Sequence, residues 1–227
     1  MNSIDQKNSK IFRFSITLDS NRDIYAVAYW KGTWYVEPGD LPVCPECGIS
    51  LEKRIQPLII EWEPGSDIIG DFTVTGSYYD MVVTQRVREA IEGKFTGFEF
   101  HPVEMYQKPS LKRPTRITKR TKPRVWLPYE GPPLWDFWIM GRAQWDLEKS
   151  RISISKVCKT CGKIFHNQPP EGHPLVLDVD NWNGCDVFRV PEYSRFVYCM
   201  DNLKNFIEEK EFTNVSFLEV GYAPSVV

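Results

Sequence analysis

Hydrophobic and polar residues alternate in several short runs along this chain of 227 residues. Residues 71–75 and 186–190 place apolar side chains at every second position, which is typical of strands with one buried face. Further runs are rich in β-branched and aromatic residues, and we expect them to form strands as well. They are "IFRFSITL", "IYAVAYWKGTWYV", "YYDMVV", "SRFVYCM", "FTGFEFHPV" and "FTNVSFLEV". The pattern therefore predicts short strands in both halves of the chain.

A helical period occurs twice among these runs. Apolar residues recur three and four positions apart, which indicates a helix with one buried stripe. The stripes consist of Val87, Ala90 and Ile91 in the first helix and of Leu203, Phe206 and Ile207 in the second. Thr84 and Asp201 are suitable N-caps, and Gly93 suits the C-terminal cap of the first helix. The expected class is α+β with mixed or antiparallel sheets.

The two helices lie within stretches that match each other. At an offset of 116 residues Phe72 falls on Phe188 and Ile91 falls on Ile207, and after one extra residue the match continues at 117. We interpret the match as a tandem duplication. The predicted units are a first repeat at 11–105, a basic linker or edge strand at 106–124, and a second repeat at 125–223.

Each predicted repeat contains one Cys-x-x-Cys-Gly turn, "CPECG" at 44–48 and "CKTCG" at 158–162. Two residues between the cysteines let both sulfurs face one ion, and the glycine permits the positive φ that turns backbone N–H groups toward the thiolates. Two such turns supply the four thiolates of a closed structural zinc site, which leaves no open position for water. We expect this zinc ion to join the two repeats. Its predicted ligands are Cys44, Cys47, Cys158 and Cys161.

A thiol–disulfide centre is the alternative for such cysteine pairs. It should head a helix in a βαβ unit, whereas both turns lead into β-rich or proline-rich sequence. His166 is either an alternative ligand or a loop histidine, and Cys185 and Cys199 are expected to fill the core. The sequence contains no evident nucleophile–histidine set and no phosphate-binding glycine loop, so we predict that the protein is not an enzyme.

Charge is distributed unevenly along the chain, whose formal net charge is −2. Eight basic residues and no acidic ones lie in 108–124, so the rest of the chain carries −10. These residues are Lys108, Lys112, Arg113, Arg116, Lys119, Arg120, Lys122 and Arg124. With 42% apolar residues and no run near the roughly 18 apolar residues of a membrane span, we expect a globular cytoplasmic protein without a membrane partner.

The two cysteine turns and the block "DVFRVPEYSRFVYCMDNLKNFIEEKEFTNVSFLEV" (186–220) together resemble a bacterial family known by its double CxxCG motif. That family is described among myxobacterial swarming-inhibition immunity proteins. The resemblance implies an immunity protein that binds a cognate polymorphic toxin in the cytoplasm, with a nuclease as one candidate for the toxin. The basic stretch and the tryptophan-rich segment 134–145, which we expect to pack across the joint between the repeats, lie outside the resemblance.

The basic stretch supports a second hypothesis, a zinc-ribbon protein that contacts nucleic-acid phosphates through residues 108–124. A run of one charge is more often a solvated linker, and the strongly acidic remainder argues against a general nucleic-acid binder. The thiol oxidoreductase is the third hypothesis. It predicts a reducible disulfide and no bound metal.

Overall fold

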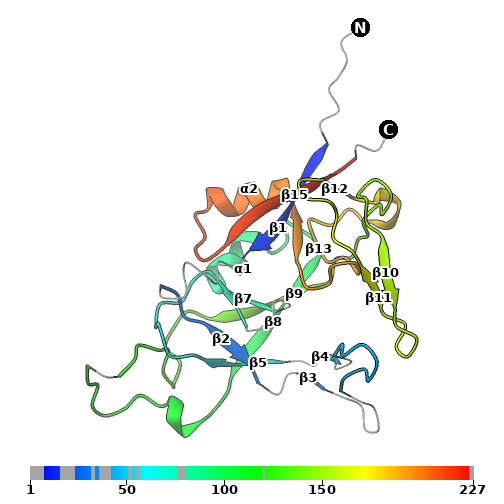
Figure 1. Cartoon of the computed structure of the whole chain (residues 1–227). Helices are drawn as coiled ribbons and strands as arrows, with labels where there is room; N and C mark the ends of the chain where they lie inside the picture. Colours follow the sequence, from blue (N-terminus) through cyan, green and yellow to red (C-terminus); the bar gives the residue numbers. More distant parts are fainter. Residues whose placement is uncertain are drawn as a thin grey trace.

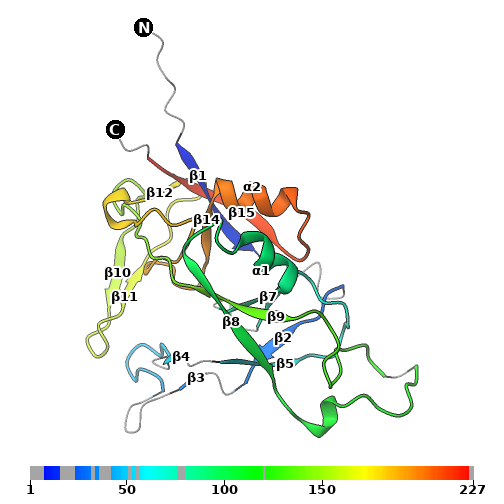
Figure 2. The same cartoon turned by 180° about the vertical axis from the view of Figure 1, so that it is seen from behind.

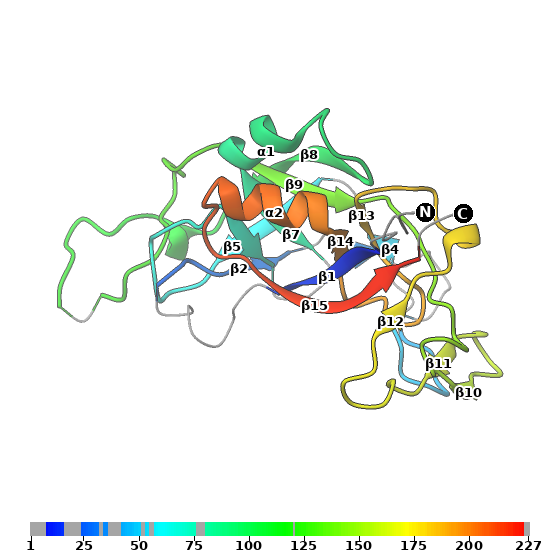
Figure 3. The ribbon, with the colours of Figure 1, turned by 90° about the horizontal axis from the view of Figure 1, so that it is seen from above.

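A computed structural model describes residues 8–15, 24–31, 34–35, 42–50, 53–54, 57–75, 80–119 and 121–224 of the chain. Within these residues the protein is mostly β-sheet with two α-helices, which confirms the predicted α+β class. Two larger sheets form the body, and the two helices lie side by side next to them (Figure 1, Figure 3). Parts of three predicted strands, at 16–18, at 32–33 with 36, and at 78–79, fall outside the described residues.

The first sheet has six strands in the order β2-β5-β8-β9-β7-β6. Its strands are β2 (Ala28–Trp30), β5 (Leu58–Trp62), β6 (Phe72–Val74), β7 (Met81–Thr84), β8 (Phe98–Met105) and β9 (Leu134–Ile139). β5 and β8 are parallel, and all other neighbours are antiparallel. The sheet is therefore mixed, as predicted.

The second sheet has five strands in the order β12-β15-β1-β14-β13. Its strands are β1 (Ser9–Ser15), β12 (Leu175–Val176), β13 (Val187–Phe188), β14 (Tyr198–Met200) and β15 (Ser216–Ala223). β12 and β15 are parallel, and the other neighbours are antiparallel. β1 comes from the start of the chain, so neither sheet is confined to one of the predicted repeat ranges.

Five strands of the first sheet and all five of the second follow the same order. Each sheet has a hairpin (β6–β7 or β13–β14), then a strand from elsewhere in the chain (β9 or β1), then a closing strand (β8 or β15) and a parallel strand (β5 or β12). The registers agree as well, because Phe137 of β9 lies opposite Phe100 of β8, and Phe14 of β1 lies opposite Phe217 of β15. The strand that completes each hairpin sheet thus lies far from the hairpin in sequence.

Strand register changes one detail of the predicted alignment. Phe72 lies opposite Val83, and Val187 lies opposite Cys199. Because Val83 and Cys199 are themselves 116 residues apart, Phe72 corresponds in register to Val187 and not to Phe188. Both candidates are fully buried, so the apolar pattern alone does not distinguish them.

The helices are α1 (Gln85–Ile91) and α2 (Asp201–Glu209). Thr84 occupies the N-cap position of α1, but its hydroxyl donates to the Asp71 carboxylate and not to a helix N–H. The predicted N-cap of α2 is wrong by one residue, because strand β14 runs directly into the helix and its last residue, Met200, takes the cap position. Gly93 has a φ of 73° just after α1, which suits its predicted capping role.

One hydrophobic core connects the two sheets. It contains the predicted helix stripes, with Val87, Ile91, Leu203 and Ile207 buried and the other two stripe residues packed against them. Aromatic rings from both sheets join this core, Phe14, Phe72 and Phe137, together with Phe212 from the loop between α2 and β15. A second core surrounds Trp145, so the tryptophan-rich segment runs from the first core to the second.

Smaller elements lie at the ends of the molecule. Two-stranded sheets are formed by β3 (Trp34–Tyr35) with β4 (Lys53–Arg54) and by β10 (Ile154–Val157) with β11 (Ile164–His166), and 3-10 turns by η1 (Pro109–Leu111) and η2 (Val179–Asn181). Residues 106–124 form a loop that extends from the end opposite β10 and β11 (Figure 1, Figure 2), with no strand in its described part. Neither α-helix is long and apolar enough to cross a membrane.

Candidate metal centre

The two cysteine turns adopt the same backbone conformation. In each turn the glycine N–H donates to the carbonyl of the first cysteine at 2.9 Å, from Gly48 to Cys44 and from Gly162 to Cys158. The two glycines have φ values of 70° and 72°, in the left-handed region that the sequence predicted. The first turn lies near β4 and the second joins β10 to β11, and the two meet at one side of the molecule (Figure 1, Figure 2).

The four predicted cysteines form one cluster. The Cys44 and Cys158 sulfurs are 3.7 Å apart, those of Cys47 and Cys161 are 3.6 Å apart, and all four lie within 4.8 Å of one another. A tetrahedral zinc site with Zn–S bonds of about 2.3 Å has S···S separations of about 3.8 Å. The thiols are free and each turn contributes two, so the cluster has the size and donors to hold a metal ion.

Packing four thiols together makes their ionisation uneven. The backbone N–H of Cys47 donates to Cys44 and lowers the pKa of the Cys44 thiol to about 7. At Cys158 the N–H of Cys161 also favours the thiolate, but burial and the neighbouring thiols outweigh it and raise the pKa to about 12. Once one thiol is ionised, its negative charge disfavours ionisation of the next thiol. A cation at the centre of the cluster would relieve this repulsion.

A direct contact also joins the two turns. The Glu46 carboxylate in the first turn accepts hydrogen bonds from the Thr160 N–H at 3.0 Å and the Thr160 hydroxyl at 2.9 Å in the second. Lys156 lies 3.7 Å from the same carboxylate. The hydrogen bond from the Thr160 hydroxyl lowers the pKa of Glu46, although burial opposes the shift.

The other predicted residues lie outside this cluster. His166 belongs to β11, and no histidine or carboxylate in the described part of the chain joins the four cysteines. Cys185 and Cys199 are buried in the two cores, as expected of small hydrophobic side chains. Neither cysteine turn begins a helix, which a thiol–disulfide centre requires.

Two contacts between the sheets were not predicted from the sequence. The Asp71 carboxylate accepts from the N–H and hydroxyl of Thr213 at 2.9 and 3.0 Å, and the Asp71 N–H donates to the same hydroxyl at 2.9 Å. Asp186 makes the same three bonds with Thr96, at 2.8, 2.9 and 3.3 Å. We call these contacts the Asp71 junction and the Asp186 junction. The sequence match pairs Thr96 with Thr213, and this pairing was the available signal that the two threonines have equivalent roles.

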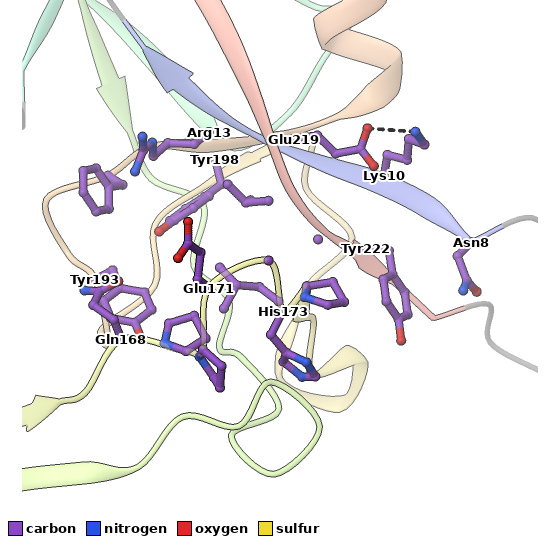
Figure 4. A pocket seen from close by; sticks show the side chains of 18 residues that line it. Asn8, Lys10, Arg13, Gln168, Glu171, His173, Tyr193, Tyr198, Glu219 and Tyr222 are labelled. Atoms are coloured by element: carbon purple, nitrogen blue, oxygen red, sulfur yellow. Dashed lines mark hydrogen bonds and ion pairs between the residues drawn. The ribbon is translucent and has the colours of Figure 1, made fainter.

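A cleft of about 650 Å³ lies beside the second sheet (Figure 4). Arg13 stacks on the Phe196 ring at 4.5 Å, and the Glu171 carboxylate points into the cleft. His173 Nε2 donates to the Lys149 carbonyl at 2.9 Å, so its proton is held by the backbone. The cleft therefore combines aromatic rings with charges of both signs, since Lys10 and Glu219, which pair with each other at 2.8 Å, line it as well.

Comparison of the sequence with protein-family models gave no match, and a search of curated proteins gave none either. The resemblance of the cysteine turns to the double CxxCG family therefore stays a prediction.

Proposed function

We propose that Cys44, Cys47, Cys158 and Cys161 bind one structural zinc ion that joins the two halves of the chain. Four thiolates at tetrahedral spacing favour zinc, and a fully protein-ligated ion has no position left for a reacting water. Elemental analysis of protein purified without added metal is expected to give one zinc per chain, and none for Cys158→Ser. Protein that contains no zinc, or iron in its place, contradicts this assignment.

The halves themselves are proposed to be a tandem duplication with exchanged strands. In this arrangement each unit contributes a cysteine turn, a parallel strand, a hairpin, a helix and a closing strand. β1 precedes the cysteine turn of the first unit but completes the second sheet, and β9 precedes the cysteine turn of the second unit but completes the first. The equal strand orders and the two matching junctions support the duplication.

For the whole protein we propose an immunity function, the non-catalytic binding of a cognate polymorphic toxin. The observation that carries the proposal is the four-cysteine cluster, because it uses both CxxCG turns of the resemblance in one closed site. Such a site cross-links a scaffold instead of reacting, and a preorganised scaffold loses less conformational entropy when it binds a partner.

Expression of the neighbouring toxin-like reading frame tests this function. Expression of the toxin-like protein alone is expected to arrest growth, and co-expression of this chain is expected to restore growth. The two proteins are expected to form a stable complex on size-exclusion chromatography. Cys158→Ser is expected to abolish the rescue, while Cys185→Ala, which removes a buried thiol outside the cluster, retains it. Continued arrest in the presence of soluble wild-type protein contradicts the proposal.

A further inference from the structure

The basic loop, residues 108–124, is a surface of one charge. Seven of its eight cations fall in the described residues, and Arg120 falls outside them. No carboxylate in the described part of the chain forms an ion pair with any of the seven. By contrast, cations on the helices pair with neighbouring acids, as Arg88 does with Glu92 and Lys204 with Glu208. The described cations of the loop therefore have no internal ion pair.

The loop has a defined shape. Its base is closed by buried Leu111, whose carbonyl accepts from the Leu127 N–H at 2.9 Å. A second bond, from the Thr121 N–H to the Thr118 carbonyl at 2.9 Å, makes a turn near its tip. On the returning side Arg124 donates to the Trp62 carbonyl in the first sheet. A simple solvated linker does not need these anchors.

Two clefts flank the base of this loop and share the wall formed by Leu127 and Pro128. The first, of about 460 Å³, is lined by Trp126 together with Arg113, Lys122 and Arg124. Two exposed carboxylates, Asp67 and Glu130, also line it. The second, of about 420 Å³, is lined by Tyr129 and Lys112. Each cleft thus combines an aromatic ring with at least one cation.

We propose that the basic loop and its two clefts bind single-stranded nucleic acid. Phosphates lie on the loop cations, and unpaired bases stack against Trp126 and Tyr129, as in sites that bind single strands without sequence preference. The Arg124 guanidinium lies over one face of the Trp126 ring, 5.3 Å from its centroid, so the first base stacks on the opposite face. A duplex is disfavoured because its bases are not free to stack and because the remainder of the chain, at −10, repels its second strand. This binding does not depend on the proposed toxin partner.

Fluorescence anisotropy of a labelled 20-nucleotide oligouridylate with the full-length protein tests the proposal. Each phosphate contact on a single strand contributes about 0.7 to the logarithmic salt slope. With about four contacts, the affinity is expected to fall about 50-fold between 50 and 200 mM salt. A 20-base-pair DNA duplex is expected to bind at least about tenfold more weakly than the single strand.

Variants separate the charge from the stacking. Arg113→Ser/Lys122→Ser removes two exposed cations, so binding at 50 mM salt weakens at least about tenfold and the fourfold change in salt costs only about sevenfold. Trp126→Ala weakens binding about tenfold without changing the salt slope, because stacking involves no counterion. The matched control Lys94→Ser/Lys210→Ser removes two exposed cations beside Phe206 and leaves binding unchanged. Arg113→Lys/Lys122→Arg restores affinity and excludes misfolding as the cause.

Four outcomes overturn the proposal. They are undetectable oligouridylate binding at 50 mM salt, equal or tighter binding of the duplex, equal losses from the control and loop pairs, and equally strong competition by a 20-residue polyglutamate. The last two would mean a general response to charge instead of a site.

Discussion

The Asp71 junction and the Asp186 junction make the same three hydrogen bonds in different surroundings. The Asp71 side chain is only 9% exposed and also accepts from Arg86 at 2.9 Å and from Thr84 at 3.0 Å. Asp186 is half-buried, and its additional donor is the Asn202 side chain. Water replaces a lost partner readily at Asp186 but poorly at Asp71. The same three hydrogen bonds are therefore expected to contribute unequally to stability, because the two carboxylates differ in burial and in their additional donors.

The largest effect is expected at the cluster that joins both halves symmetrically. Cys44→Ser and Cys158→Ser each leave three thiolates, so each should lose the proposed zinc ion and about 5 kcal/mol or more of stability. Because the two sheets share one core, both should unfold in a single transition in urea, followed by tryptophan fluorescence. Cys185→Ala is the control and should keep its zinc. Separate transitions, or loss of only the second sheet in Cys158→Ser, would contradict a shared clamp.

A smaller effect is expected from a substitution that displaces the backbone beside the Asp186 junction. Gly97 follows Thr96 with a φ of 98°, and an added Cβ would lie 2.0 Å from the Val187 carbonyl oxygen. Gly97→Ala should therefore cost about 4 kcal/mol through backbone displacement and strain. Gly93→Ala is a matched control, since Gly93 also has a positive φ but nothing lies within 4 Å of its added Cβ.

The control should cost only about 1 kcal/mol, the strain of the left-handed conformation. Thermal unfolding of both variants measures the difference. Equal losses would mean that the close approach of Gly97 to β13 contributes nothing.

Direct truncation of the two carboxylates tests the comparison itself. Asp71→Ala should cost about 3 kcal/mol, because Thr213, Arg86 and the Thr84 hydroxyl then lose the acceptor that they share near the core. Asp186→Ala should cost about 1 kcal/mol, since water reaches the freed donors. Urea unfolding gives both values, and Asp67→Ala, at an exposed carboxylate, should stay within about 0.5 kcal/mol of wild type. A larger loss at Asp186 than at Asp71 would reverse the role assigned to burial.

Local features of this molecule were predictable from the sequence, and long-range pairings were predictable only where donor chemistry required them. Two residues between cysteines and a following glycine determine a turn within five positions, and a closed site needs four thiolates, so the four-cysteine cluster could be assigned although its two turns are 114 positions apart. The Asp71 junction joins residues 142 positions apart, and a single Asp or Thr carries no local signal of its partner. Likewise, the strand formers at 11–18 predicted a strand there but did not show that β1 lies in the sheet of a distant hairpin, and strand β9 in the tryptophan-rich segment was not predicted.

The smallest effect is expected from the contact between the two cysteine turns, which joins Glu46 and Thr160 at matching positions of the turns. In the folded protein the Thr160 hydroxyl lowers the pKa of Glu46, so this carboxylate stabilises the fold above its unfolded pKa, near 4.3. The stabilisation is lost as pH falls through the lowered folded value. The melting temperature of wild type should therefore exceed that of Glu46→Gln at pH 7, and the difference should vanish by about pH 3.

Thiolate protonation and metal loss affect both proteins alike, so the difference between them isolates Glu46. Glu63→Gln, at an exposed side chain, is the control and should match wild type at every pH. A wild-type advantage that persists at pH 3 would show that the amide cannot replace the carboxylate for a reason other than charge. The contact of Glu46 with Thr160 would then act through shape and not through charge.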